Sequence, residues 1–200
     1  MSETSFKFDE NYDAVCNWCQ QNPFTNTTLE NGGKNLSSKE RNKILNKNEK
    51  TWGNNIIGND ETKQIKQWTT KLGENFVAKI LSNSGYTVNR PIKKECYKPD
   101  WEIEEAIIEV KTRNWTTPGT AGEKVLGSPY KYAAIPRLYG KPLKIICVAY
   151  QEYELTYGNT KVFGEYKDIH IEQKKMLDIW KGMDIEFVKF SDIINGNYKF

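Results

Sequence analysis

Ala106-Ile107-Ile108-Glu109-Val110-Lys111-Thr112 is an apolar segment interrupted by two charged residues. Successive side chains of a β-strand point to opposite faces of the sheet, so Glu109 and Lys111 share one face and Val110 points into the core. The apolar residues occupy both faces, which is typical of a strand covered on both sides. Burying the charged groups of Glu109 and Lys111 in such a strand costs desolvation energy. Their presence there therefore indicates that the two residues have a function.

The segments on either side of this stretch extend the predicted sheet. Upstream, Asp100–Ile103 reads as a strand that forms a hairpin with Ala106–Lys111, with Glu104-Glu105 at the turn. A tight hairpin of this kind would place Asp100 beside Glu109. Downstream, Leu143–Ala149 is an almost continuous apolar run, as expected for the buried centre of a sheet.

Helices are predicted around these strands. Apolar residues from Ile65 to Leu81 recur with the periodicity of an α-helix that Asp60 caps and Gly85 ends. The other predicted elements are a short strand at Tyr86–Asn89, a loop with one helical turn at Trp115–Gly127, a helical pattern at Ser128–Tyr139 broken by Pro136, a strand at Thr160–Tyr166, a helix at Ile169–Lys181 and a last strand at Ile185–Phe190. This order predicts an α/β fold, a mixed central β-sheet flanked by helices, over residues 60–200.

Residues 1–59 form a polar N-terminal extension, and 12 of the 19 Asn lie in the first 60 residues. Two helices are predicted in it, at Asp9–Gln20 and Ser37–Lys50, and the second begins with the capping sequence Ser-Ser-Lys-Glu. The second helix carries the cations Lys39, Arg41, Lys43, Lys47 and Lys50. This basic surface is either a solvated face or a contact for phosphates, so the extension could serve DNA contact or dimerisation.

The composition excludes several classes of protein. The 200 residues include 6 Trp, 11 Tyr and 8 Phe, which excludes a fully disordered chain. No apolar run approaches the roughly 20 residues of a spanning helix, and the N-terminus lacks a secretory signal, so we expect a cytoplasmic protein without a membrane partner. A net charge of +3 is compatible with a nucleic-acid partner but does not demonstrate one.

The cysteines and the common nucleotide-binding and hydrolase motifs give little indication of this protein's function. Cys16 and Cys19 have C-x-x-C spacing, which either reflects chance on a helix or serves metal or redox chemistry. His170 is the only histidine, and no second C-x-x-C completes a zinc site. The chain also lacks a Walker loop and a G-x-S-x-G motif, so we expect no nucleotide cofactor and no acyl transfer.

Asp100, Glu109 and Lys111 together predict a metal site. Two adjacent carboxylates repel each other, and a divalent cation between them removes the conflict. Oxygen ligands suit Mg²⁺ or Mn²⁺. The ammonium group of Lys111 could orient a metal-bound water and neutralise charge developing on a phosphate.

This arrangement resembles the PD-(D/E)XK nuclease superfamily, through Pro99-Asp100 and Glu109-Val110-Lys111. The resemblance implies a restriction-endonuclease-like core and a metal held by Asp100, Glu109 and Val110, with Mg²⁺ replaceable by Mn²⁺. It also implies another catalytic carboxylate on the preceding helix, where Glu74 lies within Thr70–Ala78.

The function expected from this resemblance is that of a Mg²⁺-dependent DNA endonuclease, of type II restriction character, acting on double-stranded DNA. Palindromic sites would require a homodimer in which each subunit cuts one strand. The residues expected to contact DNA follow the motif strand: Thr112, Arg113, Asn114, Lys124 and Lys131. The alternatives are a structure-specific repair or resolvase nuclease on the same core and a non-catalytic DNA-binding subunit.

Overall fold

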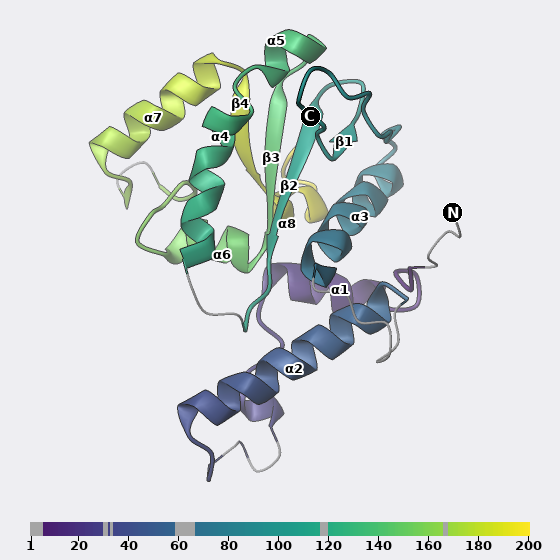
Figure 1. Cartoon of the computed structure of the whole chain (residues 1–200), viewed down its shortest axis with the longest axis vertical. Coiled ribbons are helices and arrows are strands. Elements are labelled where there is room, and N and C mark those ends of the chain that lie inside the picture. Colours follow the sequence, from purple (N-terminus) through teal and green to yellow (C-terminus); the bar gives the residue numbers. More distant parts are fainter. Residues whose placement is uncertain (1–5, 30–31, 33, 59–66, 117–119, 166–167) are drawn as a thin grey trace.

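The computed structural model describes residues 6–29, 32, 34–58, 67–116, 120–165 and 168–200, which form an α/β protein (Figure 1). Its four-stranded sheet contains β1 (Trp101–Glu102), β2 (Ile107–Arg113), β3 (Leu143–Ala149) and β4 (Ile185–Lys189), in that spatial order. β1 pairs antiparallel with β2, and the other neighbours are parallel. The predicted mixed sheet and its hairpin are therefore confirmed.

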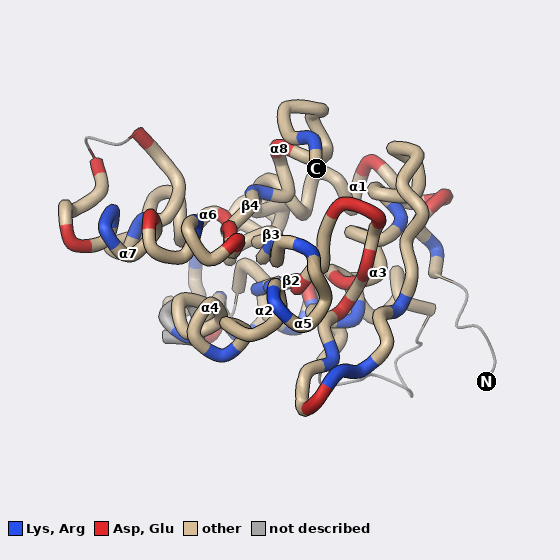
Figure 2. The backbone as a smooth tube through the Cα atoms, turned by 90° about the horizontal axis from the view of Figure 1, so that it is seen from above, with Lys and Arg blue, Asp and Glu red and all other residues tan. Residues whose placement is uncertain are grey.

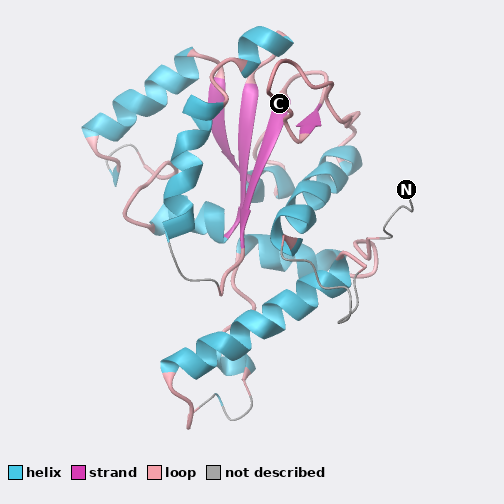
Figure 3. Ribbon diagram, viewed as in Figure 1, coloured by secondary structure: helices cyan, strands magenta, loops and turns pink. Residues whose placement is uncertain are grey.

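Helices cover both faces of the sheet (Figure 3). One face packs against α1 (Tyr12–Gln20), α3 (Trp68–Asn83) and α8 (Phe190–Ile194). The other is covered by η4 (Thr120–Gly127), α4 (Ser128–Lys131), α5 (Ile135–Tyr139), α6 (Tyr150–Tyr157) and α7 (Ile171–Gly182). A short 3₁₀ helix, η1 (Asn26–Thr28), follows α1.

Each face of β2 belongs to a different hydrophobic cluster. Ile108 and Val110 lie in the cluster that contains Phe76 of α3. Ile107 lies in the opposite cluster, together with Tyr132. This division confirms that β2 is covered on both sides and places Glu109 and Lys111 on the side of α4, because alternate residues share a face.

The N-terminal segment takes part in the first cluster. Helix α1 buries Val15, Trp18 and Cys19 against the sheet. Helix α2 (Ser38–Ile56) has the predicted capping box, in which Ser37 and Glu40 bond each other's backbone N–H groups. Helix α2 lies beyond the carboxyl ends of β2 and β3, at the bottom of the view in Figure 1.

Several predicted elements differ from the structure. Tyr86–Asn89 is not a strand and makes only a single bridge, from Asn89 to Glu102. Within Thr160–Tyr166, residues 160–165 form no strand, and the predicted cap Asp60 lies outside the described residues. Pro136 stands in the first turn of α5, where a missing N–H is tolerated, so it begins a helix and does not break one.

Among the α-helices described, α6 and α8 were not predicted, and both follow a strand without a loop. Ala149 makes the first junction with a positive φ of 57°, which is unusual for a residue other than glycine. The turn signals that separate elements in a sequence are absent there, so the sequence did not reveal α6.

Of the helices described, none is long and apolar enough to cross a membrane.

Candidate active site

The β1–β2 register brings Asp100 to Glu109. Trp101 stands opposite Ile108, so Asp100 continues the same register by one residue and faces Glu109. The Asp100 N–H donates to the Ile108 carbonyl at 3.1 Å, and the Val110 N–H donates to Asp100 Oδ2 at 2.7 Å. Backbone pairing thus produces the predicted pair of carboxylates.

The electrostatic environment of Asp100 opposes its ionisation. Burial, followed by the charges of Glu109 and Glu74, raises the pKa of Asp100 to about 7, against the lowering effect of the Val110 N–H and Lys111. The carboxyl group therefore holds a proton for part of the time near neutral pH. A bound cation would take the place of that proton, because both neutralise the same carboxylate charges.

Glu109 is only 4% exposed, and its two oxygens differ in their surroundings. Oε1 accepts from Lys111 Nζ at 2.5 Å and from the Tyr132 hydroxyl at 2.7 Å. Oε2 is buried and has no hydrogen-bond partner among the described residues. Unsatisfied buried oxygens are rare, so Oε2 is an open position for a ligand.

Tyr132 holds Glu109 in place, a role that the sequence did not reveal. Burial and the charge of Glu109 raise the pKa of its hydroxyl, which therefore stays protonated and donates to the carboxylate. Lys131 Nζ in turn donates to the Tyr132 hydroxyl oxygen at 3.0 Å. The hydroxyl thus links a predicted DNA-binding lysine to a predicted metal ligand.

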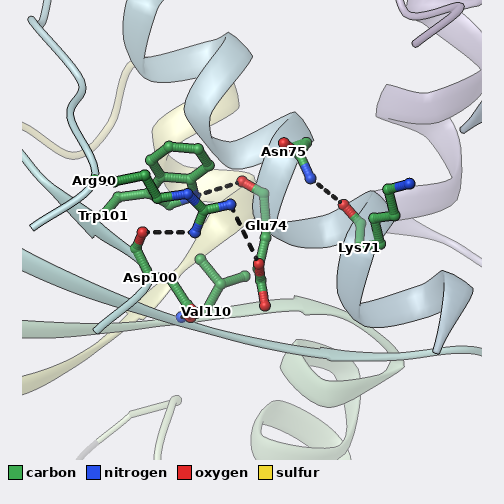
Figure 4. A network of polar contacts seen from close by, with 7 residues as sticks. All are labelled: Lys71, Glu74, Asn75, Arg90, Asp100, Trp101 and Val110. Atoms are coloured by element: carbon green, nitrogen blue, oxygen red, sulfur yellow. Dashed lines mark hydrogen bonds and ion pairs between the residues drawn. The ribbon is translucent and has the colours of Figure 1, made fainter. Parts of the chain in front are cut away.

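Glu74 reaches the site from α3, and its side chain extends toward β2, which carries Val110 (Figure 4). Trp101 Nε1 donates to the Glu74 carbonyl at 2.8 Å. Arg90 bridges the two acidic residues, with Nη2 3.7 Å from Glu74 Oε2 and Nη1 2.8 Å from the Asp100 carbonyl. Its guanidinium lies 3.6 Å from the centre of the Trp101 ring. Arg90 was also not singled out in the sequence.

A glycine lets α3 approach β2. A Cβ atom added to Gly73 would lie 1.8 Å from Thr112 Oγ1, closer than any real contact. The Thr112 side chain therefore lies against α3, and its buried hydroxyl has no partner in the described chain. Gly73 directly precedes Glu74, so this close approach also sets the position of the Glu74 carboxylate.

A basic pocket of about 370 Å³ opens beside Lys111. We call it the cationic pocket; its lining residues are Lys111, Thr112, Arg113, Lys124, Val125, Gly127, Ser128, Lys131 and Gln151. Four of the five residues expected to bind DNA line it, although they come from β2, η4 and α4. The Nε2 group of Gln151 is buried there with no partner among the described residues.

Two of the residues expected to bind DNA are already engaged. Arg113 is 7% exposed, and its Nη1 lies 2.7 Å from both oxygens of Glu154. Asn114 donates to Glu49 Oε2 at 3.1 Å, outside the cationic pocket. The exposed cations that line the pocket are Lys124 and Lys131, whereas Lys111 is half-buried and paired with Glu109.

The acidic pair fits a hard divalent cation. Within the residues that the structure describes, no three His, Cys, Asp or Glu side chains form a ready metal cage. The pair nevertheless supplies carboxylate oxygens, the unpartnered Glu109 Oε2 and two charges that oppose each other. Val110 could offer a cation only its backbone carbonyl oxygen, because its side chain has no donor atom and its N–H binds Asp100.

The two other candidate regions have different environments. Cys19 is fully buried in α1, where burial raises the pKa of its thiol, so it packs as a small apolar residue. On α2, Lys39, Lys43 and Lys47 are exposed, whereas Arg41 binds the Leu36 carbonyl at 2.9 Å. Figure 2 shows Lys and Arg interspersed with Asp and Glu along the chain.

A buried carboxylate outside the predicted site organises the segment after β2. Glu49 of α2 is fully buried and accepts from Trp18 Nε1 at 2.8 Å and from the Trp115 N–H at 2.9 Å. Its other oxygen accepts from the Thr116 N–H at 2.9 Å and from the Thr116 hydroxyl at 2.6 Å. In the sequence, Glu49 is one acid within a basic helix and carries no signal of this role.

Comparisons with known protein families, characterised proteins and solved structures return no match for this chain.

Proposed function

We propose that this protein is a Mg²⁺-dependent DNA endonuclease that hydrolyses phosphodiester bonds. The observation that carries the proposal is the Asp100–Glu109 pair, whose Lys111 neighbour also lines the cationic pocket. Carboxylates that bind a divalent cation, beside a pocket that binds phosphates, are the two parts that hydrolysis of a phosphodiester needs.

Each residue has a separate task in this proposal. Asp100 and Glu109 would hold the cation, and Glu74 would bind its waters. The cation, Mg²⁺ or Mn²⁺, would polarise the phosphate and lower the pKa of an attacking water. Lys111 would orient that water and offset charge on the phosphate, while Tyr132 donates to Glu109 and so holds its orientation.

The restriction-type reading extends this proposal to double-stranded DNA and a homodimer, in which each subunit would cut one strand of a palindromic site. The two alternatives give different products. Discrete fragments from mixed plasmid DNA support the restriction reading, and cutting only at junctions or flaps supports a repair nuclease. A protein that binds DNA but never cuts it would be a binding subunit.

The test is plasmid cleavage with Mg²⁺, comparing Lys111→Met with Lys144→Met. Both lysines lie on strands and pair with a glutamate, since Lys144 Nζ lies 2.6 Å from Glu186 Oε2. We expect Lys111→Met to lower the cleavage rate by about 10²–10³-fold, because one electrostatic contact to the transition state is lost. Lys144→Met should cut normally.

Glu109→Gln and Asp100→Asn should abolish cleavage while DNA binding persists, because phosphate repulsion falls. A folded Lys111→Met or Asp100→Asn protein that cuts at the wild-type rate would refute the assignment. Activity of Glu74→Gln at the wild-type rate would remove only the third carboxylate.

A further inference from the structure

Tyr150, Tyr153 and Tyr157 follow one another along α6 beside the cationic pocket, and Trp115 packs against the first two, with its ring centre 5.5 Å from that of Tyr153. We call these four side chains the aromatic row. The ring centres of Trp115 and Tyr150 lie 5.7 Å apart, and those of Tyr150 and Tyr153 are also 5.7 Å apart. Tyr157 extends the row, 4.9 Å from Tyr153. Tyr153 and Tyr157 are 46% and 69% exposed, so the outer half of this aromatic row is open to solvent.

The three tyrosines of the aromatic row line two hollows. One, of about 590 Å³, is lined by the row itself and by Gln20, Gln21 and Asn22. The other, of about 390 Å³, lies against Tyr150, Tyr153 and Tyr157 and includes Leu126 and Asn159. The tyrosine rings thus border open space in both hollows. Residues with side-chain amides line the hollows too, and the amides of Gln20, Gln21 and Asn22 also make hydrogen bonds within the chain.

The aromatic row adjoins the cationic pocket, although the pocket shares no lining residue with either hollow. The Arg113 guanidinium carbon lies 4.7 Å from the centre of the Tyr150 ring, and Arg113 lines the cationic pocket. Gln151, which also lines that pocket, follows Tyr150 in the chain. A ligand with a phosphate in the cationic pocket would therefore extend directly onto the aromatic row.

Unpaired nucleobases have the chemistry that this surface requires. Every base has a flat π-face that stacks on aromatic rings, and its edges pair with amide groups. In a closed duplex the bases are stacked on one another and their faces are not available. The combination of rings, amides and adjacent cations therefore favours a strand whose bases are exposed.

We propose that the aromatic row stacks unpaired bases of the same DNA strand whose phosphates occupy the cationic pocket. This inference rests on the proposed nuclease function for the identity of the ligand. It deepens that function toward the structure-specific alternative rather than the restriction reading, because it assigns as substrate a DNA that carries unpaired nucleotides next to the bond to be cut.

The experiment measures binding without metal, so that cleavage plays no part. Fluorescence anisotropy compares a blunt duplex with the same duplex carrying a single-stranded tail. We expect wild-type protein to prefer the tailed DNA by about 5–150-fold, since stacking of one base on an aromatic ring contributes about 1–3 kcal/mol. Tyr153→Leu combined with Tyr157→Leu should abolish the preference and leave blunt-duplex binding unchanged. Tyr130→Leu is the matched control, because Tyr130 is 89% exposed and lines none of the three pockets.

The outcomes separate this inference from the proposed function. Equal affinity of wild-type protein for both DNAs, or a preference that survives the double substitution, would overturn the stacking role even if plasmid is cut. A tail preference lost only in the double variant would support it, even in a protein that never cuts. Quenching of tryptophan fluorescence by the tailed DNA gives an independent readout, because Trp115 belongs to the aromatic row.

Discussion

Asp100 is the residue whose environment is most informative. It is held by the Val110 N–H, while the charges of Glu109 and Glu74 act against its ionised form. A carboxylate with only a structural role would not be expected beside the negative charges of two other carboxylates. The raised pKa of Asp100 therefore makes the site testable without any assay of activity.

The first prediction concerns the stability of metal-free protein as a function of pH. The pKa of Asp100 is about 7 when folded and near the ordinary 3.8 when unfolded, so the folded state binds more protons between these values. Stability should thus fall as pH rises from about 4 to 7, by at most about 4 kcal/mol. Denaturant unfolding of wild-type and Asp100→Asn protein measures this.

Asp100→Asn should remove that decrease and be the more stable protein above pH 7, because the amide cannot ionise. Adding Mg²⁺ at pH 8 should stabilise the wild type and leave Asp100→Asn unaffected. Parallel pH profiles for the two proteins would contradict the raised pKa.

At the scale of elements, the contact between α3 and β2 sets the site. Gly73→Ala would drive a methyl group into Thr112, and we expect a loss of about 1–3 kcal/mol in unfolding free energy. Gly182→Ala in α7 is the control, because nothing lies within 4 Å of that added methyl group. Thermal unfolding compares the two variants. Thr112→Ala should restore part of the stability lost in Gly73→Ala, since it removes the closest atom. A Gly73→Ala protein as stable as the wild type would contradict the close contact.

The exposed lysines of α2 test whether that helix contacts DNA. If it does, Lys43→Gln with Lys47→Gln should lower the slope of log affinity against log salt by about 0.9 for each lost phosphate contact. Lys175→Gln with Lys181→Gln on α7 is the matched pair, since these lysines are also exposed. A slope unchanged in both pairs would leave the α2 lysines as a solvated face.

At the scale of the whole molecule, Glu49 joins the N-terminal helices to the sheet. It binds Trp18 of α1 and the backbone of Trp115 and Thr116 after β2. The same hydrophobic cluster contains Val15 of α1 and Phe76 of α3. We therefore expect the N-terminal helices and the sheet to unfold together.

Glu49→Ala should destabilise the protein by about 3 kcal/mol or more, because it leaves several buried donors without an acceptor. Glu40→Ala is the control, since Glu40 is an exposed residue of the same helix whose contacts are with its own cap. Tryptophan fluorescence and far-UV circular dichroism should give coincident transitions in the wild type. Separate transitions, or a Glu49→Ala protein of wild-type stability, would contradict this coupling.

Local pattern was enough to determine the central strands. Leu143–Ala149 is the observed β3, and the Asp100–Glu109 pairing follows from hairpin register alone, because both depend on the alternation of neighbouring residues. The capping box at Ser37 is likewise local. The sequence therefore determined the mixed sheet and the meeting of two carboxylates with a lysine.

Only the tertiary structure decided which distant residues complete the site. Tyr132, Arg90 and Glu49 act through partners 10 or more positions away in the chain, and no periodicity encodes such contacts. The same holds for Arg113, whose charge Glu154 engages across 41 positions. Strands and turns follow from neighbouring residues, but long-range packing sets which polar groups meet, because the energy of a buried group depends on all the atoms around it.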